Sequence, residues 1–291
     1  MFHGSIPALV TPFNNYAVDY DAYKALIERQ VVSGSSALVP VGTTGESATL
    51  THDEHRKVVS TCIEVAAGRV PVIAGCGSNA TAEAIGLVEH AKSAGADAAL
   101  VVCPYYNRPD QDGLEAHFTA INDAVDLPII LYNVPGRTVC DLLPETVGRL
   151  AKLPNIVGIK DATGDLARVT QHRLLAGDDF IQLSGDDPSA LGFRAMGGKG
   201  VISVTANVAP KLNAQMHQAA SDGDYALARD IDLKLIGLHK DLFVSASPGP
   251  TKYAMSKLGL CSGEVRSPIT IPSPDACKLI DAALAAAGLG G

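Results

Sequence analysis

The sequence predicts an α/β fold, a (β/α)8 TIM barrel with a C-terminal helical extension. Eight short apolar runs rich in β-branched residues recur along the chain, at first about 30 residues apart, as in successive βαβ units. The runs are continuously apolar rather than alternating, which is typical of parallel strands that are covered on both faces. A length of 291 residues also suits a barrel, which takes about 250 residues, with one addition.

Helix start signals lie between these runs. They are a capping box from Thr51 to Glu54, an aspartate before a proline at Asp187, and a polar turn that begins at Thr163. A helix is expected over 210–221, and the rest of the chain has helical periodicity without a further strand. We therefore predict a barrel over residues 1–222 and a helical extension over 223–291. The predicted strands are 6–12, 37–41, 72–75, 99–103, 129–133, 156–160, 181–184 and 201–204.

A doubly wound open sheet is the competing fold. No predicted strand is followed by the G-x-G-x-x-G fingerprint of dinucleotide-binding folds. The glycine-rich stretch 197–200 also lacks the serine or threonine of a P-loop. Both absences favour the closed barrel.

Composition excludes several classes of function. The formal net charge is −8 and no block of lysine and arginine stands out, which disfavours nucleic acid and anionic membranes as partners. The six cysteines are scattered without a C-x-x-C pair, so neither a zinc site nor a disulfide framework is indicated. The first residues do not resemble a signal peptide, and no apolar run is long enough to span a bilayer. We expect a soluble, cytoplasmic protein.

Lys160 ends the apolar run 156–160 and is followed by a polar turn. Burial disfavours the charged form of a lysine, and an amine that is neutral at physiological pH can form a Schiff base with a carbonyl substrate. The alternative is a strand-end lysine whose ammonium group reaches water. In a barrel, catalytic residues lie at the carboxyl ends of the strands, where Lys160 is expected.

Other strand ends carry groups that suit an anionic carbonyl substrate. Two threonines, Thr43 and Thr44, lie between glycines and offer hydroxyl and backbone N–H groups to a carboxylate, although an ordinary capped turn has the same composition. Tyr132 can carry a proton, or can simply pack in the core with a hydrated hydroxyl. Arg137, just beyond it, can hold a carboxylate through two hydrogen bonds.

Two features invite a metal interpretation. His52 and His55 lie one turn apart at a helix start, but no third ligand follows in the sequence, which favours solvated histidines. Asp186 and Asp187 are better explained by helix capping and hydrogen bonding. The residues therefore favour a lysine-based aldolase over a metal-dependent one.

Five motifs together resemble the dihydrodipicolinate synthase family, within the pyruvate-dependent class I aldolase and N-acetylneuraminate lyase superfamily. They are Gly-Thr-Thr-Gly-Glu-Ser at 42–47, Pro-Tyr-Tyr-Asn-Arg-Pro at 104–109, Tyr-Asn-Val-Pro-Gly-Arg-Thr at 132–138, Gly-Ile-Lys-Asp-Ala-Thr-Gly at 158–164 and Leu-Ser-Gly-Asp-Asp at 183–187. The resemblance implies condensation of pyruvate with L-aspartate 4-semialdehyde, the first committed step of diaminopimelate and lysine biosynthesis. It also implies a homotetramer built as a dimer of dimers, with no cofactor or metal beyond the covalent Schiff base.

The resemblance assigns roles to eight residues. Lys160 would form the Schiff base. Three hydroxyl groups would relay protons, the last reaching in from a neighbouring subunit: Tyr132, Thr43 and Tyr106. The pyruvate carboxylate would be held by Thr44 and the semialdehyde carboxylate by Arg137, while backbone groups would line the pocket at Gly185 and Ile202.

The resemblance also implies an inhibitory L-lysine site at a dimer interface. Glu83 would bind the α-amino group of the effector, and two histidines would border its ε-amino end. The chain matches the family at every position of this site, namely Ser47, Ala48, His52, His55, Asn79, Glu83 and Tyr105.

Three positions depart from the family pattern. Gly136 stands where serine is frequent, Asp161 where glutamate is frequent, and Val139 where glycine often follows the Arg-Thr pair. Because a β-branched residue tolerates a positive φ poorly, the loop around Arg137 is expected to differ in shape.

Other activities remain open from the sequence. N-acetylneuraminate lyase and keto-deoxy sugar acid aldolases share the lysine and the tyrosine, but Arg137 and the complete lysine-binding set argue against them. A non-catalytic pyruvate- or lysine-binding regulator would be expected to have lost Lys160 or the tyrosines, and all are present.

Overall fold

The structure, a computed structural model, describes residues 2–290. Seven strands form one parallel sheet. In spatial order they are β1 (Gly4–Pro7), β9 (Gly200–Ser203), β8 (Ile181–Ser184), β7 (Ile156–Asp161), β6 (Ile129–Asn133), β5 (Ala98–Val102) and β4 (Ile73–Gly75). The segment 37–41 closes the ring, because Val39 pairs with Ala8 beside β1 and Leu38 pairs with Val72 beside β4, both in parallel. The predicted eight-stranded barrel is confirmed.

The second strand is shorter than predicted. Only Leu38 and Val39 form bridges within the predicted strand 37–41. Pro40 has no N–H group to donate to a ladder, and Val41 has a left-handed backbone, with φ of 48°. The chain therefore leaves the sheet early and enters the loop that carries Thr43 and Thr44.

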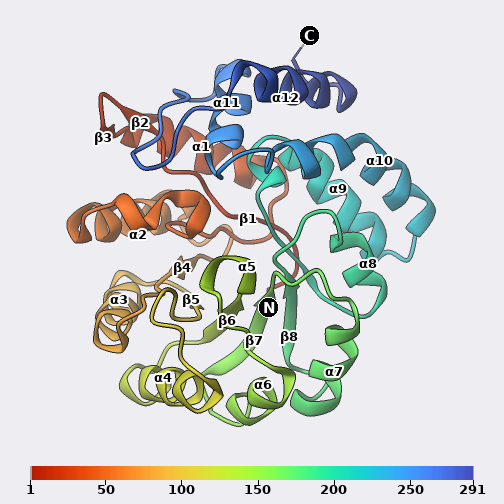
Figure 1. The fold of residues 1–291 in the computed structure, drawn as a ribbon. Coiled ribbons are helices and arrows are strands. Elements are labelled where there is room, and N and C mark those ends of the chain that lie inside the picture. Colours follow the sequence, from red (N-terminus) through yellow and green to blue (C-terminus); the bar gives the residue numbers. More distant parts are fainter. Residues whose placement is uncertain (1, 291) are drawn as a thin grey trace.

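Helices surround the ring of strands (Figure 1). The predicted capping box is confirmed, because the Thr51 hydroxyl accepts from the N–H of Glu54 and the Glu54 carboxylate accepts from the N–H of Thr51. The helices of the barrel are α1 (Tyr20–Val32), α2 (His52–Ala66), α3 (Thr81–Ala94), α4 (Gln111–Ala124), α5 (Pro135–Thr138), α6 (Pro144–Leu150), α7 (Ala167–Ala176), α8 (Ala190–Ala195) and α9 (Pro210–Ser221).

The predicted helix start at Asp187 is wrong, since α8 begins at Ala190. Asp187 is buried and accepts hydrogen bonds from the hydroxyl of Ser203 and from the N–H groups of Val204 and Thr205. Its neighbour Asp186 accepts from the N–H of Ser189 just before α8. Capping and hydrogen bonding thus explain the aspartate pair, as predicted, but Asp187 serves the loop after β9 rather than a helix.

The C-terminal extension is helical, as predicted, and consists of α10 (Tyr225–Asp241), α11 (Gly249–Lys257) and α12 (Pro274–Ala286). These helices share one apolar cluster with α9 and with Val10 and Leu26 of the barrel. The loop between α11 and α12 lies against a small hairpin, β2 (Phe13–Asn14) and β3 (Ala17–Val18), because Glu264 and Arg266 form hydrogen bonds with Tyr16 (Figure 1). The hairpin was not predicted, because two-residue strands carry no readable alternation. No helix within residues 2–290 has the length and apolarity that crossing a membrane requires.

The buried histidine of α9 makes stability sensitive to acid. Burial, with a smaller contribution from Arg194 and His239, lowers the pKa of His217 from 6.5 to about 3. Below pH 6.5 the unfolded chain therefore binds a proton at this histidine and the folded chain does not. The free energy of unfolding then decreases by about 1.4 kcal/mol for each pH unit of acidification, owing to this group.

We expect chemical denaturation at pH values from 7 to 4 to show this loss in the wild type and a shallower loss in His217→Gln. The comparison uses the slope of the free energy of unfolding against pH in each protein, because a destabilisation by the substitution that does not depend on pH leaves this slope unchanged. Equal slopes in the two proteins would contradict the assignment.

Candidate active site

Lys160 and Tyr132 lie side by side at the carboxyl ends of adjacent strands. Tyr132 and Lys160 are the penultimate residues of β6 and β7 and pair in register, and each is only 6% exposed. The Nζ atom of Lys160 lies 3.9 Å from the centroid of the Tyr132 ring. An amine and a phenol therefore meet in a nearly water-free part of the barrel, the arrangement that both predicted roles require.

The neighbouring strands leave Lys160 little free space. A Cβ atom at Gly185 would lie 2.9 Å from Cε of Lys160 and 2.7 Å from Cβ of Ala162, so this position requires glycine. Ile202 of β9 is buried in the same apolar interior as Tyr132. Gly185 thus lies against the lysine and Ile202 lies in the barrel interior with Tyr132, whereas neither residue lines the cavity described below.

The loop 42–50 brings two threonines to the same end of the barrel. Thr43 to Gly45 form a single 3-10 turn, in which Thr44 is buried and Thr43 is partly exposed. Left-handed residues flank the turn, Val41 with φ of 48° and Glu46 with φ of 56°. A β-branched residue is strained in this conformation, and such strain is typical of functional loops.

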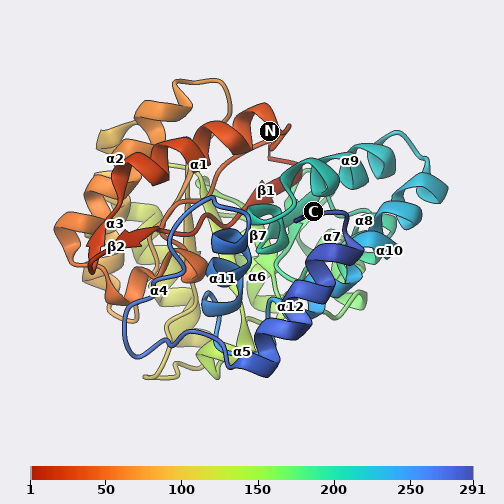
Figure 2. The same cartoon turned by 90° about the horizontal axis from the view of Figure 1, so that it is seen from above.

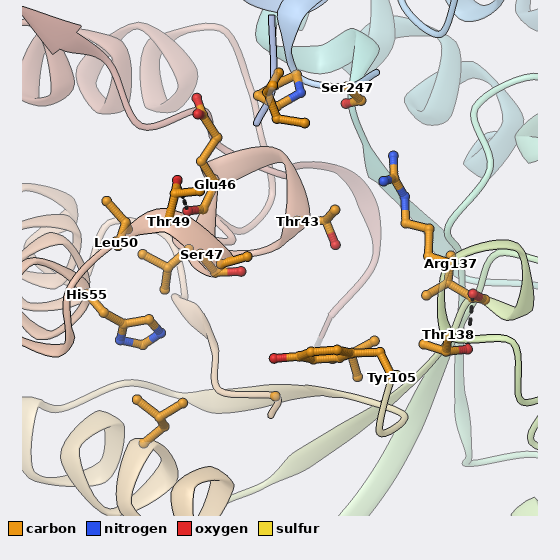
Figure 3. A pocket seen from close by; sticks show the side chains of 18 of the residues that line it. Thr43, Glu46, Ser47, Thr49, Leu50, His55, Tyr105, Arg137, Thr138 and Ser247 are labelled. Carbon is orange, nitrogen blue, oxygen red and sulfur yellow. Dashed lines mark hydrogen bonds between the residues drawn. The ribbon is translucent and has the colours of Figure 1, made fainter. Parts of the chain in front are cut away.

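A cavity of about 530 Å³ opens beside this loop (Figure 3). Thr43 and Arg137 line one part of it, together with Ser247 of the extension. In Figure 3 the guanidinium group of Arg137 points toward Ser247. Lys160 and Tyr132 do not line the cavity, so the predicted substrate groups are split between its wall and the barrel interior behind it.

Arg137 lies exposed on α5, the short helix after β6. Val139 caps that helix with φ of 58°, and its N–H donates to the carbonyl of Pro135. The loop therefore keeps the left-handed turn that a glycine would make. Val139 thus adopts the left-handed conformation that a β-branched residue tolerates poorly, and a differently shaped loop around Arg137 stays a prediction.

The predicted lysine-binding residues gather around the other part of the same cavity. Nε2 of His52 lies 3.2 Å from a carboxylate oxygen of Glu83, whose other oxygen accepts from the Ser78 hydroxyl. Of the seven predicted residues, Asn79 does not line the cavity. Those that line it are Ser47, Ala48, His52, His55, Glu83 and Tyr105.

The two histidines differ in their surroundings. His52 is exposed, as predicted, but His55 is only 6% exposed and its Nε2 donates to the carbonyl of Gly75 at 2.9 Å. The prediction of a solvated histidine is wrong for His55, because α2 packs this face against the barrel. Burial lowers the pKa of His55 to about 4, so the ring is neutral at physiological pH.

Tyr106 differs from every other predicted catalytic residue. It is 92% exposed, has φ of 73°, and lies in the loop after β5, away from Lys160 of its own chain. Its neighbour Tyr105 is 38% exposed and lines the cavity. The chain thus does not bring Tyr106 into its own site, and this agrees with a role in the site of another subunit.

The sequence did not indicate the cavity residues that the extension contributes. Ser247 and Pro248 lie before α11, and Pro268 and Ile269 lie in the loop before α12. Their only signal is a proline-rich composition, which also describes ordinary helix connections. They reach the site through the packing of distant segments.

Comparison with known proteins agrees with this geometry. Residues 1–287 match the Dihydrodipicolinate synthetase family. The 4-hydroxy-tetrahydrodipicolinate synthase of Hyphomonas neptunium is 69% identical over 291 residues, which cover 99% of each chain.

Solved structures show the same fold. The chloride-inhibited dihydrodipicolinate synthase of Acinetobacter baumannii, complexed with pyruvate, has a TM-score of 0.97 at 44% identity, over 99% of this chain and 100% of that one. The enzyme of Cyanidioschyzon merolae with lysine bound has a TM-score of 0.96 at 40% identity, over 99% of each chain. With the match spanning nearly the whole chain, this protein belongs to the dihydrodipicolinate synthetase family.

Proposed function

We propose that this chain condenses pyruvate with L-aspartate 4-semialdehyde to give 4-hydroxy-tetrahydrodipicolinate, with Lys160 as the imine-forming residue. The observation that carries the proposal is the buried contact between Nζ of Lys160 and the ring of Tyr132, 3.9 Å from its centroid. The relatives described above carry the name of this synthase, which favours it over N-acetylneuraminate lyase or a keto-deoxy sugar acid aldolase.

Each step of the proposed condensation moves a proton. The neutral amine attacks the keto carbon of pyruvate, and water leaves to give the imine. Loss of a methyl proton gives the enamine, whose carbon attacks the aldehyde and turns its oxygen into a hydroxyl group. The amine of the second substrate then attacks the imine carbon, closes the ring and releases Lys160. Tyr132, Thr43 and a Tyr106 from a neighbouring subunit would carry these protons.

Two groups would hold the carboxylates of the substrates. Thr44 and the adjacent backbone N–H groups would bind the carboxylate of pyruvate, because a turn with free N–H groups suits an anion. Arg137 at the cavity wall would bind the carboxylate of the semialdehyde. The chain would work as a homotetramer, as the resemblance to the family implies, and the exposed Tyr106 would then reach into the site of a neighbouring subunit. The cytoplasmic location stays a prediction.

Reduction with borohydride in the presence of pyruvate tests the proposal directly. The reagent converts the imine into a stable secondary amine, and mass spectrometry of peptides locates the added mass. We expect a single pyruvate adduct on Lys160. Absence of an adduct on Lys160 in the active enzyme would overturn the mechanism.

L-Lysine is the proposed inhibitor, bound at the part of the cavity that Glu83 and the two histidines line. Removing the carboxylate charge in Glu83→Gln should raise the lysine concentration for half-inhibition at least about tenfold, since a hydrogen bond to a charged group contributes about 1.5–3 kcal/mol. Steady-state inhibition curves measure the shift. Glu89→Gln, an exposed position on the same helix, is the matched control and should leave inhibition unchanged. Unchanged wild-type turnover at saturating lysine would refute the proposed regulation.

A further inference from the structure

A buried ion pair lies behind the loop that carries the two threonines. The carboxylate of Glu46 lies 2.5 Å from Nζ of Lys252 on α11, and their side chains are 1% and 0% exposed. The mechanism uses neither residue. Burying two charges costs desolvation free energy, which their mutual attraction offsets only if their other hydrogen-bonding groups also find partners. Stability alone therefore does not explain why the chain buries this pair.

The surroundings of the pair meet part of that capacity, and the Glu46 oxygen that faces Lys252 accepts no other hydrogen bond from the part of the chain that the structure describes. The second carboxylate oxygen of Glu46 accepts from the backbone N–H of Arg266 at 2.9 Å. Nζ of Lys252 donates to the carbonyl of Glu264 at 2.9 Å and lies 3.9 Å from the centroid of the Phe13 ring. The ion pair therefore joins three segments that are far apart in the sequence: the loop 42–50, the N-terminal hairpin and the C-terminal extension.

Arg266 makes a second set of tethers to the same region. Its guanidinium group donates to both carboxylate oxygens of Glu54, at 2.6 and 2.7 Å, and to the carbonyl of Thr49 at 3.0 Å. It also donates to the carbonyl of Tyr16 in the hairpin. Figure 2 shows the loop after α11, which contains Arg266, running to the hairpin strand β2. The start of α2 and the end of the loop 42–50 are thus fixed by one side chain.

The tethered loop has little structure of its own. It consists of two single 3-10 turns, and Glu46 sits between them in a left-handed conformation. Figure 3 shows that the Glu46 side chain extends away from Thr43 and Ser47, so its carboxylate anchors the loop from behind. Short irregular loops are held by their contacts rather than by a regular hydrogen-bond ladder. The position of the threonine hydroxyls consequently depends on contacts made by the extension.

We propose that Glu46, Lys252 and Arg266 are positioning residues, through which the C-terminal extension holds Thr43 and Thr44 in their working geometry. The proposal rests on the proposed function of the threonines. Hydrogen bonds between charged groups fix distance and direction, whereas an apolar contact of equal stability would allow the loop to shift along the surface. Charged contacts are therefore better able to hold the threonines in one position. Glu46 also lines the cavity, but its carboxylate extends away from Thr43, so in this assignment the three side chains act through the loop and not on the substrate.

The double variant Glu46→Gln/Lys252→Met separates positioning from stability. It removes both charges together and leaves no unpaired buried ion, so it is expected to unfold within a few degrees of the wild type. A displaced loop should lower kcat/KM for pyruvate about tenfold to a hundredfold, since misplacement by about 1 Å carries a cost of this order. Wild-type kcat and KM in the folded double variant would overturn the proposal. Lys278→Met, at an exposed ion pair of the same extension, is the control and should leave both constants unchanged.

Arg266→Met tests the same proposal without disturbing the buried pair. It should raise KM for pyruvate while borohydride still traps the adduct at saturating pyruvate, because Lys160 stands on β7 and not on the tethered loop. A wild-type KM in Arg266→Met would contradict the positioning role of Arg266, whatever the double variant shows. Failure of the proposed function looks different, since the wild type itself would then form no adduct.

Discussion

Replacement of Lys160 by alanine is expected to lower kcat/KM for the condensation about a thousandfold or more and to abolish the adduct trapped by borohydride. The amine is the only group in the proposed mechanism that bonds covalently to pyruvate, and loss of a covalent nucleophile is among the most severe changes to an enzyme. Coupled assay of product formation measures the rate, and mass spectrometry measures the adduct.

A variant at a second lysine is the control for the loss of a positive charge. Lys199 is exposed at the opposite end of the barrel, just before β9, and Lys199→Ala should keep both activity and adduct formation. Circular dichroism of both variants reports whether the fold is retained. Retention of a pyruvate adduct in folded Lys160→Ala would show that another amine forms the imine, and the assignment would be lost.

Tyr132→Phe is expected to lower kcat about a hundredfold to a thousandfold while leaving the fold intact. The variant keeps the ring against which Nζ of Lys160 packs at 3.9 Å and removes only the hydroxyl. Because positioned general acids and bases contribute about 10²- to 10⁴-fold, the loss should fall in that range. Single-turnover trapping should show that the imine still forms, but more slowly.

Tyr225→Phe on α10 is the control for the loss of a phenol, since this residue belongs to the extension and packs against the α9–α12 cluster. It should retain the wild-type kcat. A Tyr132→Phe enzyme with wild-type kcat would remove the tyrosine from the proton relay and leave it a packing role only.

The fold was predictable because its signals are local. A β-branched apolar run such as 129–133 codes for a buried parallel strand, and the observed β6 has those bounds. The helix at 210–221 likewise begins at its proline, as predicted. Signals that depend on distant partners were misread. Asp187 precedes a proline, as a cap does, yet its carboxylate is used by the loop after β9.

The candidate site was predictable only in part for the same reason. Lys160 and Tyr132 lie near the carboxyl ends of consecutive strands, so the barrel topology alone brings them together. The burial of His55 follows from the packing of α2 on the barrel, which an isolated helix start does not reveal. The pairing of Glu46 with Lys252 follows from the return of the extension across the barrel, and no pattern in either segment predicts it.

The single cavity that borders both groups of predicted binding residues matters for inhibitor design. Its volume of about 530 Å³ is in the range of sites for drug-sized ligands. We expect one compound to place an acidic group at Arg137 and a basic group near Glu83, with an aromatic linker against Tyr105, which lies between Arg137 and His55 in Figure 3. Linking the two ends makes the second contact intramolecular, so the combined affinity exceeds that of either fragment.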